Sequence, residues 1–190
     1  MKLRDSGMPD EAYWATLFDT ELILDRLEID ATVQDVAELG CGYGTFSIPV
    51  AKRISGRLLT YDIDPEMVSR TSARAREAGL ENVLCLVRDV FADGFDVDDA
   101  SHDACLLFNI LHCEEPARLL TEAARVVRPG GYVLAIHWRC DVETPRGPSL
   151  DIRPQPERIV SWARDTSLLK HDGLILDLPP WHYGLRIQRI

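Results

Sequence analysis

Three alternate glycines separate a short apolar run from a segment with helical spacing. The apolar run covers residues 33–39, Gly40, Gly42 and Gly44 follow it, and the helical segment covers residues 45–54. Glycine lets the backbone turn sharply and approach a ligand closely, because it has no Cβ. The N–H groups that begin the following helix favour an anionic group on that ligand. This order of elements predicts the first unit of a parallel α/β sheet with a ligand at the turn.

The rest of the chain repeats the alternation of apolar runs and helical patterns. We expect further strands at residues 57–61, 83–87, 103–108, 132–137, 174–178 and 183–189. We expect helices at residues 10–27, 45–54, 64–78, 116–127 and 156–169, with a loop over residues 141–156. Asp10 and Asp64 are placed to cap two of these helices, and Gly79 to end one. The pattern predicts a doubly wound, mostly parallel sheet with helices on both faces.

Length and charge limit the possible organisation and partners. At 190 residues the chain is long enough for one domain and short for two, so we expect a single domain over residues 1–190. Within it, residues 1–30 are expected to form a helical cap over the site and residues 139–160 a Pro- and Arg-rich loop on the substrate side. The net charge of −10 opposes binding to a phosphate backbone, so no nucleic-acid partner is expected.

Targeting signals and metal-ligand patterns are missing from the sequence. Apolar runs are shorter than the roughly 18 residues of a membrane span, and the charged N-terminus has no signal core, so we expect a cytoplasmic protein without a membrane partner. The five cysteines form no CxxC pair, which indicates reduced thiols and no resident metal. A site built from Cys41, Cys113 and Cys140 is the alternative.

Carboxylates accompany the glycine turn. Glu38 precedes the turn, and Asp62 and Asp89 follow the second and third expected strands. Because the carboxyl ends of parallel strands meet at one edge, these acids are expected at the ligand site. A carboxylate at Asp62 can accept ribose hydroxyls, at roughly 1.5 to 3 kcal/mol for each charge-assisted bond. Three acids would repel a pyrophosphate, so a cationic adenosyl ligand without phosphate fits better than a dinucleotide.

Five segments together resemble a known family. The segment ELGCGYG (residues 38–44) resembles motif I of the class I S-adenosylmethionine-dependent methyltransferases. Residues 61–67 resemble the acidic loop after the second strand of that family, and residues 88–90 its adenine-binding loop. Residues 108–112 resemble its strand-four motif, and residues 128–131 its turn before strand five. The resemblance implies a seven-stranded sheet with an antiparallel last strand, and S-adenosylmethionine as cofactor.

The resemblance also assigns roles to individual residues. Glu38 and the turn would hold the methionine moiety, Asp62 the ribose and Asp89 the adenine amino group, while Ile63 and Val90 would flank the adenine ring. The full set of expected cofactor residues is Glu38, Gly40, Cys41, Gly42, Gly44, Asp62, Ile63, Met67, Asp89, Val90 and Asn109. The rival cofactor is NAD, whose fingerprint requires Gly or Ala where Thr45 stands.

The expected function is methyl transfer from S-adenosylmethionine to a small-molecule acceptor. His112 is the candidate acid–base residue, because it follows the fourth strand at the ligand edge. The alternative for His112 is a loop histidine that shapes the pocket. Two other functions remain open: a cofactor-binding subunit without transfer activity of its own, and an NAD-dependent reductase.

Four further residues are expected on the acceptor side. Trp14 and Phe18 could cap the cofactor from the N-terminal helix, as in the resembled family, with core packing as the alternative for Phe18. His137 could face the rim of the pocket or be a hydrogen-bonded strand end. Arg146 and Arg153 lie among prolines, and arginine pairs bidentately with carboxylate or phosphate. We hypothesise that they hold a small anionic acceptor. The alternative is a solvated loop in which they pair with nearby acids.

Overall fold

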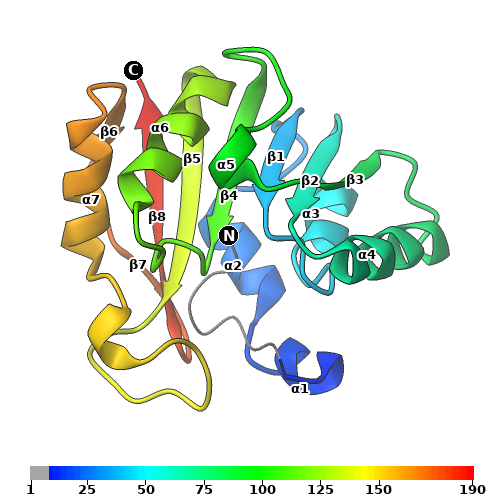
Figure 1. Ribbon diagram of the computed structural model, residues 1–190, viewed down its shortest axis with the longest axis horizontal. Coiled ribbons are helices and arrows are strands. Elements are labelled where there is room, and N and C mark those ends of the chain that lie inside the picture. The colour runs from blue at the N-terminus through cyan, green and yellow to red at the C-terminus, as the bar shows by residue number, and fades with distance from the viewer. Residues whose placement is uncertain (1–8) are drawn as a thin grey trace.

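An eight-stranded sheet forms the centre of the molecule in the computed structural model, which describes residues 9–190 (Figure 1). The strands are β1 Val36–Leu39, β2 Leu58–Asp62, β3 Val83–Val87, β4 His102–Phe108, β5 Val127–Trp138, β6 Leu169–His171, β7 Leu176–Leu178 and β8 His182–Arg189. Their order is β3-β2-β1-β4-β5-β8-β6, and β7 also pairs with β8. Strands β1 to β5 pair in parallel, whereas β8 is antiparallel to β5, β6 and β7. The predicted doubly wound, mostly parallel sheet is confirmed.

Helices cover both faces of the sheet. They are α1 Glu11–Ala15, α2 Thr20–Arg26, α3 Ser47–Arg53, α4 Pro65–Glu77, α5 Val90–Asp93, α6 Pro116–Val126 and α7 Pro156–Asp165, with a 3-10 turn at Leu150–Ile152. One buried cluster joins the sheet to α2 and α3, and a second joins it to α5, α6 and α7. Helix α4 packs on β2 and β3. No helix in the part of the chain that the structure describes is both long and apolar enough to cross a membrane.

The sheet has eight strands, one more than the seven expected from the sequence. The three-residue strand β6 occupies residues 169–171, where the sequence pattern predicted the end of a helix and then a loop. Helix α7 stops at Asp165 because Thr166 caps it and Ser167 takes a φ of +59°, which a helix cannot continue. The chain then turns back and pairs antiparallel with β8.

The single helix expected over residues 10–27 is two helices, α1 and α2. Asp10 caps the first by accepting the N–H of Tyr13, and Asp19 caps the second by accepting the N–H of Leu22. The break between them turns Leu17 and Phe18 into the core, where both are buried. Asp19 is therefore a second N-cap residue within the helical pattern, and it marks the start of a separate helix that we did not expect from the sequence.

Strand β5 begins earlier than expected. It starts at Val127 and continues through Gly130 and Gly131, which were expected to form a turn before it. A Cβ on Gly131 would lie 2.4 Å from the carbonyl oxygen of Asp103, so glycine allows the backbones of β4 and β5 to approach closely. The pairing of β4 with β5 shifts register at this point.

The register of the sheet brings the candidate residues to one edge. Leu39, the last residue of β1, pairs with Tyr61 of β2 and with Leu107 of β4. The residues that follow, including Gly40, Asp62 and Asn109, therefore lie at the carboxyl end of the parallel strands. Figure 1 shows α1 and the segment after β5 at this same end of the sheet.

Candidate active site

The N–H groups of the glycine turn are used inside the protein. Those of Gly40 and Cys41 donate to the carbonyl oxygen of Tyr61 at 2.6 and 3.2 Å. The N–H of Gly42 donates to the Asp62 carboxylate at 3.0 Å, and that of Gly44 donates to the Cys41 carbonyl at 2.8 Å. These four donors are therefore not presented to a phosphate. The turn does not provide the N–H cradle that a dinucleotide requires.

Asp62 links the end of β2 to the turn. One of its carboxylate oxygens accepts the N–H of Gly42, and the other accepts the N–H of Asp64 at 2.9 Å. An ionised carboxylate has about four lone-pair positions, so two remain for hydroxyl donors. The adjacent Ile63 side chain is 39% exposed. This half-buried acid with an apolar neighbour fits the ribose of an adenosyl group.

Glu38 lies beneath the turn and is held by two hydroxyl groups. Its side chain is 2% exposed, and Oε2 accepts hydrogen bonds from Ser47 at 2.5 Å and Thr60 at 2.6 Å. Burial raises the pKa of Glu38 to about 7, although both hydroxyl bonds favour the ionised form. These contacts join β1, β2 and the start of α3. They give Glu38 a part in fixing the turn, and its contact with the methionine moiety stays a prediction.

The thiol of Cys41 lies in the same buried region. Burial raises its pKa well above the ordinary value, and the nearby acids Asp62 and Glu38 raise it further. The thiol is therefore protonated and unreactive at neutral pH.

The expected adenine side of the site combines exposed and buried residues. Asp89 is half-buried and caps α5 by accepting the N–H of Ala92 at 3.1 Å. Val90 is 3% exposed and belongs to the core, whereas Ile63 is 39% exposed. Met67 is half-buried in the first turn of α4. Of the two residues expected to flank the ring, Ile63 has the more accessible surface.

Asn109 adopts a conformation that few residue types tolerate. Its φ is +56°, in the left-handed region where asparagine is enriched among residues other than glycine. Its N–H donates to the carbonyl of Ile136 at 2.9 Å, which holds the end of β4 against β5. Its side-chain oxygen is buried and accepts no hydrogen bond from the described residues. A buried acceptor at this edge fits the ammonium group of a methionine moiety.

Two histidines meet where β4 and β5 end. Nε2 of His137 lies 3.3 Å from Nδ1 of His112, and Nδ1 of His137 lies 3.3 Å from the carbonyl oxygen of Trp138. His137 is fully buried, and its pKa falls to about 3 through loss of solvation, with a further lowering by His112. His112 is half-buried and lines a cavity of about 230 Å³. His137 is therefore buried, contacts His112 through Nε2, and does not face the rim of the pocket.

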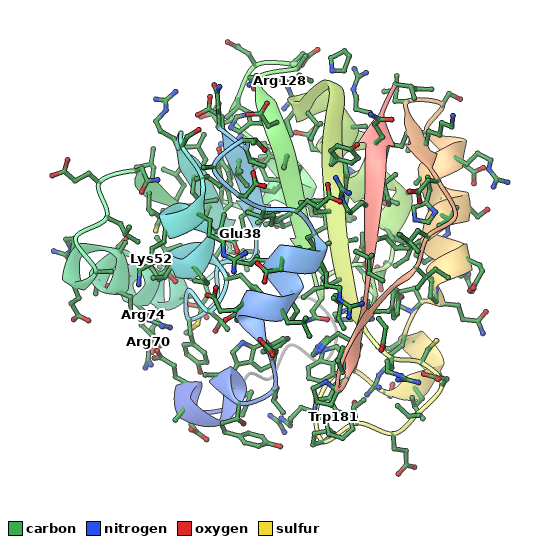
Figure 2. The ribbon with its side chains drawn as sticks, turned by 180° about the vertical axis from the view of Figure 1, so that it is seen from behind. Glu38, Lys52, Arg70, Arg74, Arg128 and Trp181 are labelled. Atoms are coloured by element: carbon green, nitrogen blue, oxygen red, sulfur yellow. The ribbon has the colours of Figure 1, made fainter. Side chains whose placement is uncertain are left out.

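The N-terminal helix α1 is tied to the glycine turn. The phenol of Tyr43 donates to the carbonyl of Pro9 at 2.8 Å, and Glu11 pairs with Arg74 at 3.0 Å. Arg74 also donates to the carbonyl of Tyr43 at 2.5 Å. Figure 2 shows Arg74 together with Arg70 of α4 at the end of the molecule where α1 lies. The start of the described chain is therefore anchored beside the turn.

Trp14 packs among aromatic rings. Its ring lies 5.0 Å from that of Phe18 and 6.2 Å from that of Trp138, at the end of β5. Trp14 is half-buried at the edge of the core cluster. Phe18 is 8% exposed and packs in the core, whereas capping of the cofactor by Trp14 stays a prediction.

The contacts of Arg153 give it a structural role. The residue is 8% exposed, and its guanidinium donates to the carbonyls of Pro148 at 2.7 Å, Arg139 at 2.8 Å and Arg146 at 3.4 Å. These bonds fold residues 139–153 around one cation. The guanidinium is thus bonded to backbone carbonyls and not, as the alternative had it, to nearby acids. Arg153 also lines the cavity at His112, so its contact with an anionic acceptor stays a prediction. Arg146 is exposed.

The structure adds two residues to the acceptor side that sequence reasoning did not select. Arg158 and Trp162 line the His112 cavity, and the Arg158 guanidinium lies 5.3 Å from the centre of the Trp162 ring. A spacing of four residues in the predicted helix would have placed them on one face. Within residues 9–190, no group of three or more His, Cys, Asp or Glu side chains is arranged to hold a metal ion.

A doubly wound sheet with a glycine turn after β1, and with Asp62 and Asp89 at the ends of β2 and β3, is the arrangement expected of a class I S-adenosylmethionine-dependent methyltransferase. Residues 36–131 match the family described as methyltransferase domain. The match covers half of the chain, and the protein belongs to this family. S-adenosylmethionine is its cofactor.

Individual relatives agree with this family. The chain is 27% identical over 174 residues to a probable S-adenosylmethionine-dependent methyltransferase of Mycolicibacterium smegmatis, covering 88% of this chain and 61% of that protein. It also resembles the crystal structure of a SAM-dependent methyltransferase from Aquifex aeolicus, with a TM-score of 0.82, 22% identity, and 95% and 94% of the two chains covered. The [4+2]-cyclase SpnF has a TM-score of 0.68 and 24% identity, with 92% of this chain and 62% of SpnF covered. The chain spans less than two thirds of the length of the first curated relatives it matches.

Proposed function

We propose that this protein transfers the methyl group of S-adenosylmethionine to a small-molecule acceptor. The observation that carries the proposal is the cavity of about 230 Å³ lined by His112. His112 follows Asn109 by three residues in the sequence, and the cavity is lined by Leu111, His112 and other residues of the segment after β4. A cavity of this size suits a small acceptor.

Methyl transfer depends more on the alignment of the two reactants than on particular catalytic side chains. Bound S-adenosylmethionine supplies an electrophilic methyl group on a good leaving group. Holding an acceptor in line with that methyl group accounts for roughly 7 to 11 kcal/mol of the barrier. In this proposal Asp62 and Asn109 bind and orient the cofactor, Glu38 fixes the turn, and the His112 cavity positions the acceptor and excludes water.

An alternative is a domain that binds the cofactor without transferring its methyl group. The same fold is found in SpnF, which is named a [4+2]-cyclase, so the fold by itself does not require methyl transfer. The two proposals differ in one measurable product. An active transferase releases S-adenosylhomocysteine when an acceptor is supplied, and a binding subunit does not.

The experiment combines binding with turnover. Calorimetric titration with S-adenosylhomocysteine and with NADH measures cofactor choice, and we expect the former alone to bind. Release of S-adenosylhomocysteine from S-adenosylmethionine is then measured with and without the small-molecule fraction of a cell extract. Release that depends on this fraction supports the proposal. Tight binding with no release from any fraction would favour the subunit.

A further inference from the structure

A second cavity lies where β5 ends and β8 begins. Its volume is about 410 Å³, and it is lined by the segment after β5, the start of α7, β7 and the start of β8, so it is termed the β8 cavity. The N–H of Arg139 donates to the carbonyl of Trp181 at 2.8 Å, and Figure 2 shows Trp181 at this end of the molecule. None of its lining residues lines the cavity at His112. Small-molecule sites commonly have volumes of roughly 300 to 1,000 Å³, so the β8 cavity has room for a ligand of its own.

The imidazole of His182 lines this cavity without a hydrogen-bond partner. His182 is 1% exposed, its ring packs against those of Trp138 at 4.2 Å and Phe18 at 4.6 Å, and neither ring nitrogen is hydrogen-bonded to any of the described residues. Burial lowers the pKa of His182 to about 3, and the charge of Arg153 lowers it further, so the ring is neutral near pH 7. One nitrogen then donates and the other accepts. Because an unpaired buried polar group destabilises a protein, such a group in a cavity wall indicates a place for a polar ligand.

The remaining polar lining of the β8 cavity is mostly acidic. Arg139 and Asp141 form a two-bonded ion pair at 3.0 and 2.6 Å, which neutralises both charges. Hydrogen bonds from this pairing raise the pKa of Arg139, and the charge of Asp177 adds to the effect. Glu157 and Asp177 are exposed, and neither forms an ion pair with a residue in the part of the chain that the structure describes. Three carboxylates and one guanidinium therefore leave the lining with a net charge of −2, which favours a cation and repels an anion.

We propose that the β8 cavity binds a small primary amine in its protonated form, at a site separate from that of the methyl acceptor. An ammonium group has three N–H donors and no acceptor, so it can donate to the carboxylates of Glu157 and Asp177 and to the lone pair of His182. Ile175 and Leu176 line the same cavity, and they offer an apolar surface to the carbon chain of the amine. Ile175 is 41% exposed, so binding would also cover apolar surface that is open to water.

The two cavities lie on opposite sides of a shared wall. The phenol of Tyr183 donates to the carbonyl of Pro154 at 2.5 Å, and Arg153 donates to the carbonyl of Arg139 at 2.8 Å. Tyr183 and Arg139 line the β8 cavity, whereas Pro154 and Arg153 line the cavity at His112. An amine in the β8 cavity is therefore separated from the acceptor cavity by hydrogen-bonded protein. The inference does not rest on the proposed function, and amine binding is measured without cofactor.

Three probes of equal chain length test the charge preference. Butan-1-amine, butan-1-ol and butanoate are titrated at pH 7 and low salt into protein labelled with nitrogen-15 at histidine. The ring-nitrogen NMR signals of His182, assigned with His182→Phe, report on the site. We expect butan-1-amine to shift these signals and to bind at least about threefold more tightly than butan-1-ol, with butanoate weaker still. Unchanged His182 signals with butan-1-amine, or equal affinity for butanoate, would overturn the proposal.

Substitution of the two exposed acids tests the binding contacts. Glu157→Gln combined with Asp177→Asn should raise the dissociation constant of butan-1-amine about threefold to tenfold, as expected for two solvent-exposed charge pairs. The matched control combines Glu81→Gln with Asp165→Asn, which changes the net charge by the same amount. Glu81 and Asp165 are exposed and line neither cavity, so the control should bind butan-1-amine like the unchanged protein. Equal losses of affinity in both double variants would show a response to net charge alone and would refute the site.

The fate of the amine distinguishes this site from the acceptor site. With S-adenosylmethionine present, we expect butan-1-amine to bind without being methylated. Its methylation, detected by mass spectrometry, would overturn the proposal of a separate site. If no small-molecule fraction promotes release of S-adenosylhomocysteine, the proposed function fails while the amine site stands. If His182→Phe does not fold, the two double variants still decide the outcome, because their substitutions lie at exposed positions.

Discussion

The carboxylate of Asp62 accepts the N–H of Gly42 at 3.0 Å, so the acid at the end of β2 and the glycine turn after β1 form one unit. The other oxygen of Asp62 accepts the N–H of Asp64. An acid that is already held on two sides loses little conformational freedom when a ligand binds to it. Asp62 is therefore the residue on which cofactor affinity should depend most.

Asp62→Ala should weaken binding of S-adenosylhomocysteine by about ten- to a hundredfold. The expected loss corresponds to charge-assisted hydrogen bonds worth roughly 1.5 to 3 kcal/mol each, together with a looser turn. Calorimetric titration measures it. The matched control is Asp103→Asn, because Asp103 also accepts two backbone N–H groups, those of Gln34 and Asp35, but at the far edge of the sheet. Equal losses of affinity in both variants would refute a specific role for Asp62.

Gly44→Ala should lower both stability and cofactor affinity. Gly44 has a φ of +75°, and a Cβ there would lie 3.2 Å from Thr71 and 3.4 Å from Ile48. Backbone strain and crowding together should cost about 2 kcal/mol or more in urea unfolding. Gly79→Ala is the control, since its φ is +68° and nothing lies within 4 Å of a Cβ. It should cost about 1 kcal/mol and leave binding of S-adenosylhomocysteine unchanged.

The buried carboxyl of Glu38 should make stability depend on pH. Its pKa in the folded protein is about 7, above the ordinary 4.5, because burial disfavours the charged form. The folded state thus binds more protons than the unfolded state between these values, so this contribution is complete below about pH 4.5 and is lost as pH rises through 7. The full contribution is about 3 kcal/mol.

Urea unfolding at several pH values tests this dependence. Glu38→Gln keeps an oxygen that can accept hydrogen bonds from Ser47 and Thr60 but cannot titrate. We expect the free energy of unfolding of the unchanged protein to fall between about pH 5 and pH 8, and that of the variant to change less. Parallel curves for the two proteins would mean that Glu38 is already ionised in the folded state at acid pH.

The two arginines after β5 should respond differently to substitution. Arg153→Ala removes a cation bonded to three backbone carbonyls, which should destabilise the protein by about 2 to 4 kcal/mol. Arg153→Lys should rescue little, because one ammonium group cannot reproduce the planar guanidinium. Arg146→Ala should leave urea unfolding nearly unchanged, and if Arg146 holds the acceptor it should raise the Michaelis constant for the acceptor alone. A stable Arg153→Ala variant would contradict the structural role.

Much of the fold could be predicted because local signals agreed with the tertiary structure. The strand Val83–Val87 matches its prediction, and α4 begins after the Asp64 cap and ends before Gly79, as expected. The predictions fail where contacts between residues far apart in the sequence determine the structure. Gly131 is drawn into β5 by the close approach of Asp103, and β6 depends on pairing with β8. Neither contact leaves a pattern in the neighbouring sequence.

In the candidate site, too, some residues could be placed from the sequence and others could not. The positions of Asp62 and Asn109 at the ligand edge follow from the ends of β2 and β4, which apolar runs predict well. The pairing of His112 with His137 could not be predicted, because it depends on the side-chain directions of two neighbouring strand ends. The carbonyl contacts of Arg153 depend on the path of an irregular segment, for which sequence provides no register.

Transfer of a labelled methyl group tests the central claim most directly. The protein is incubated with S-adenosylmethionine that carries a deuterated methyl group, together with a cell extract. The small-molecule, protein and nucleic-acid fractions are then separated and analysed by mass spectrometry. The account predicts label in the small-molecule fraction, in step with release of S-adenosylhomocysteine. Label in the protein or nucleic-acid fraction, or in none of the three, would contradict it.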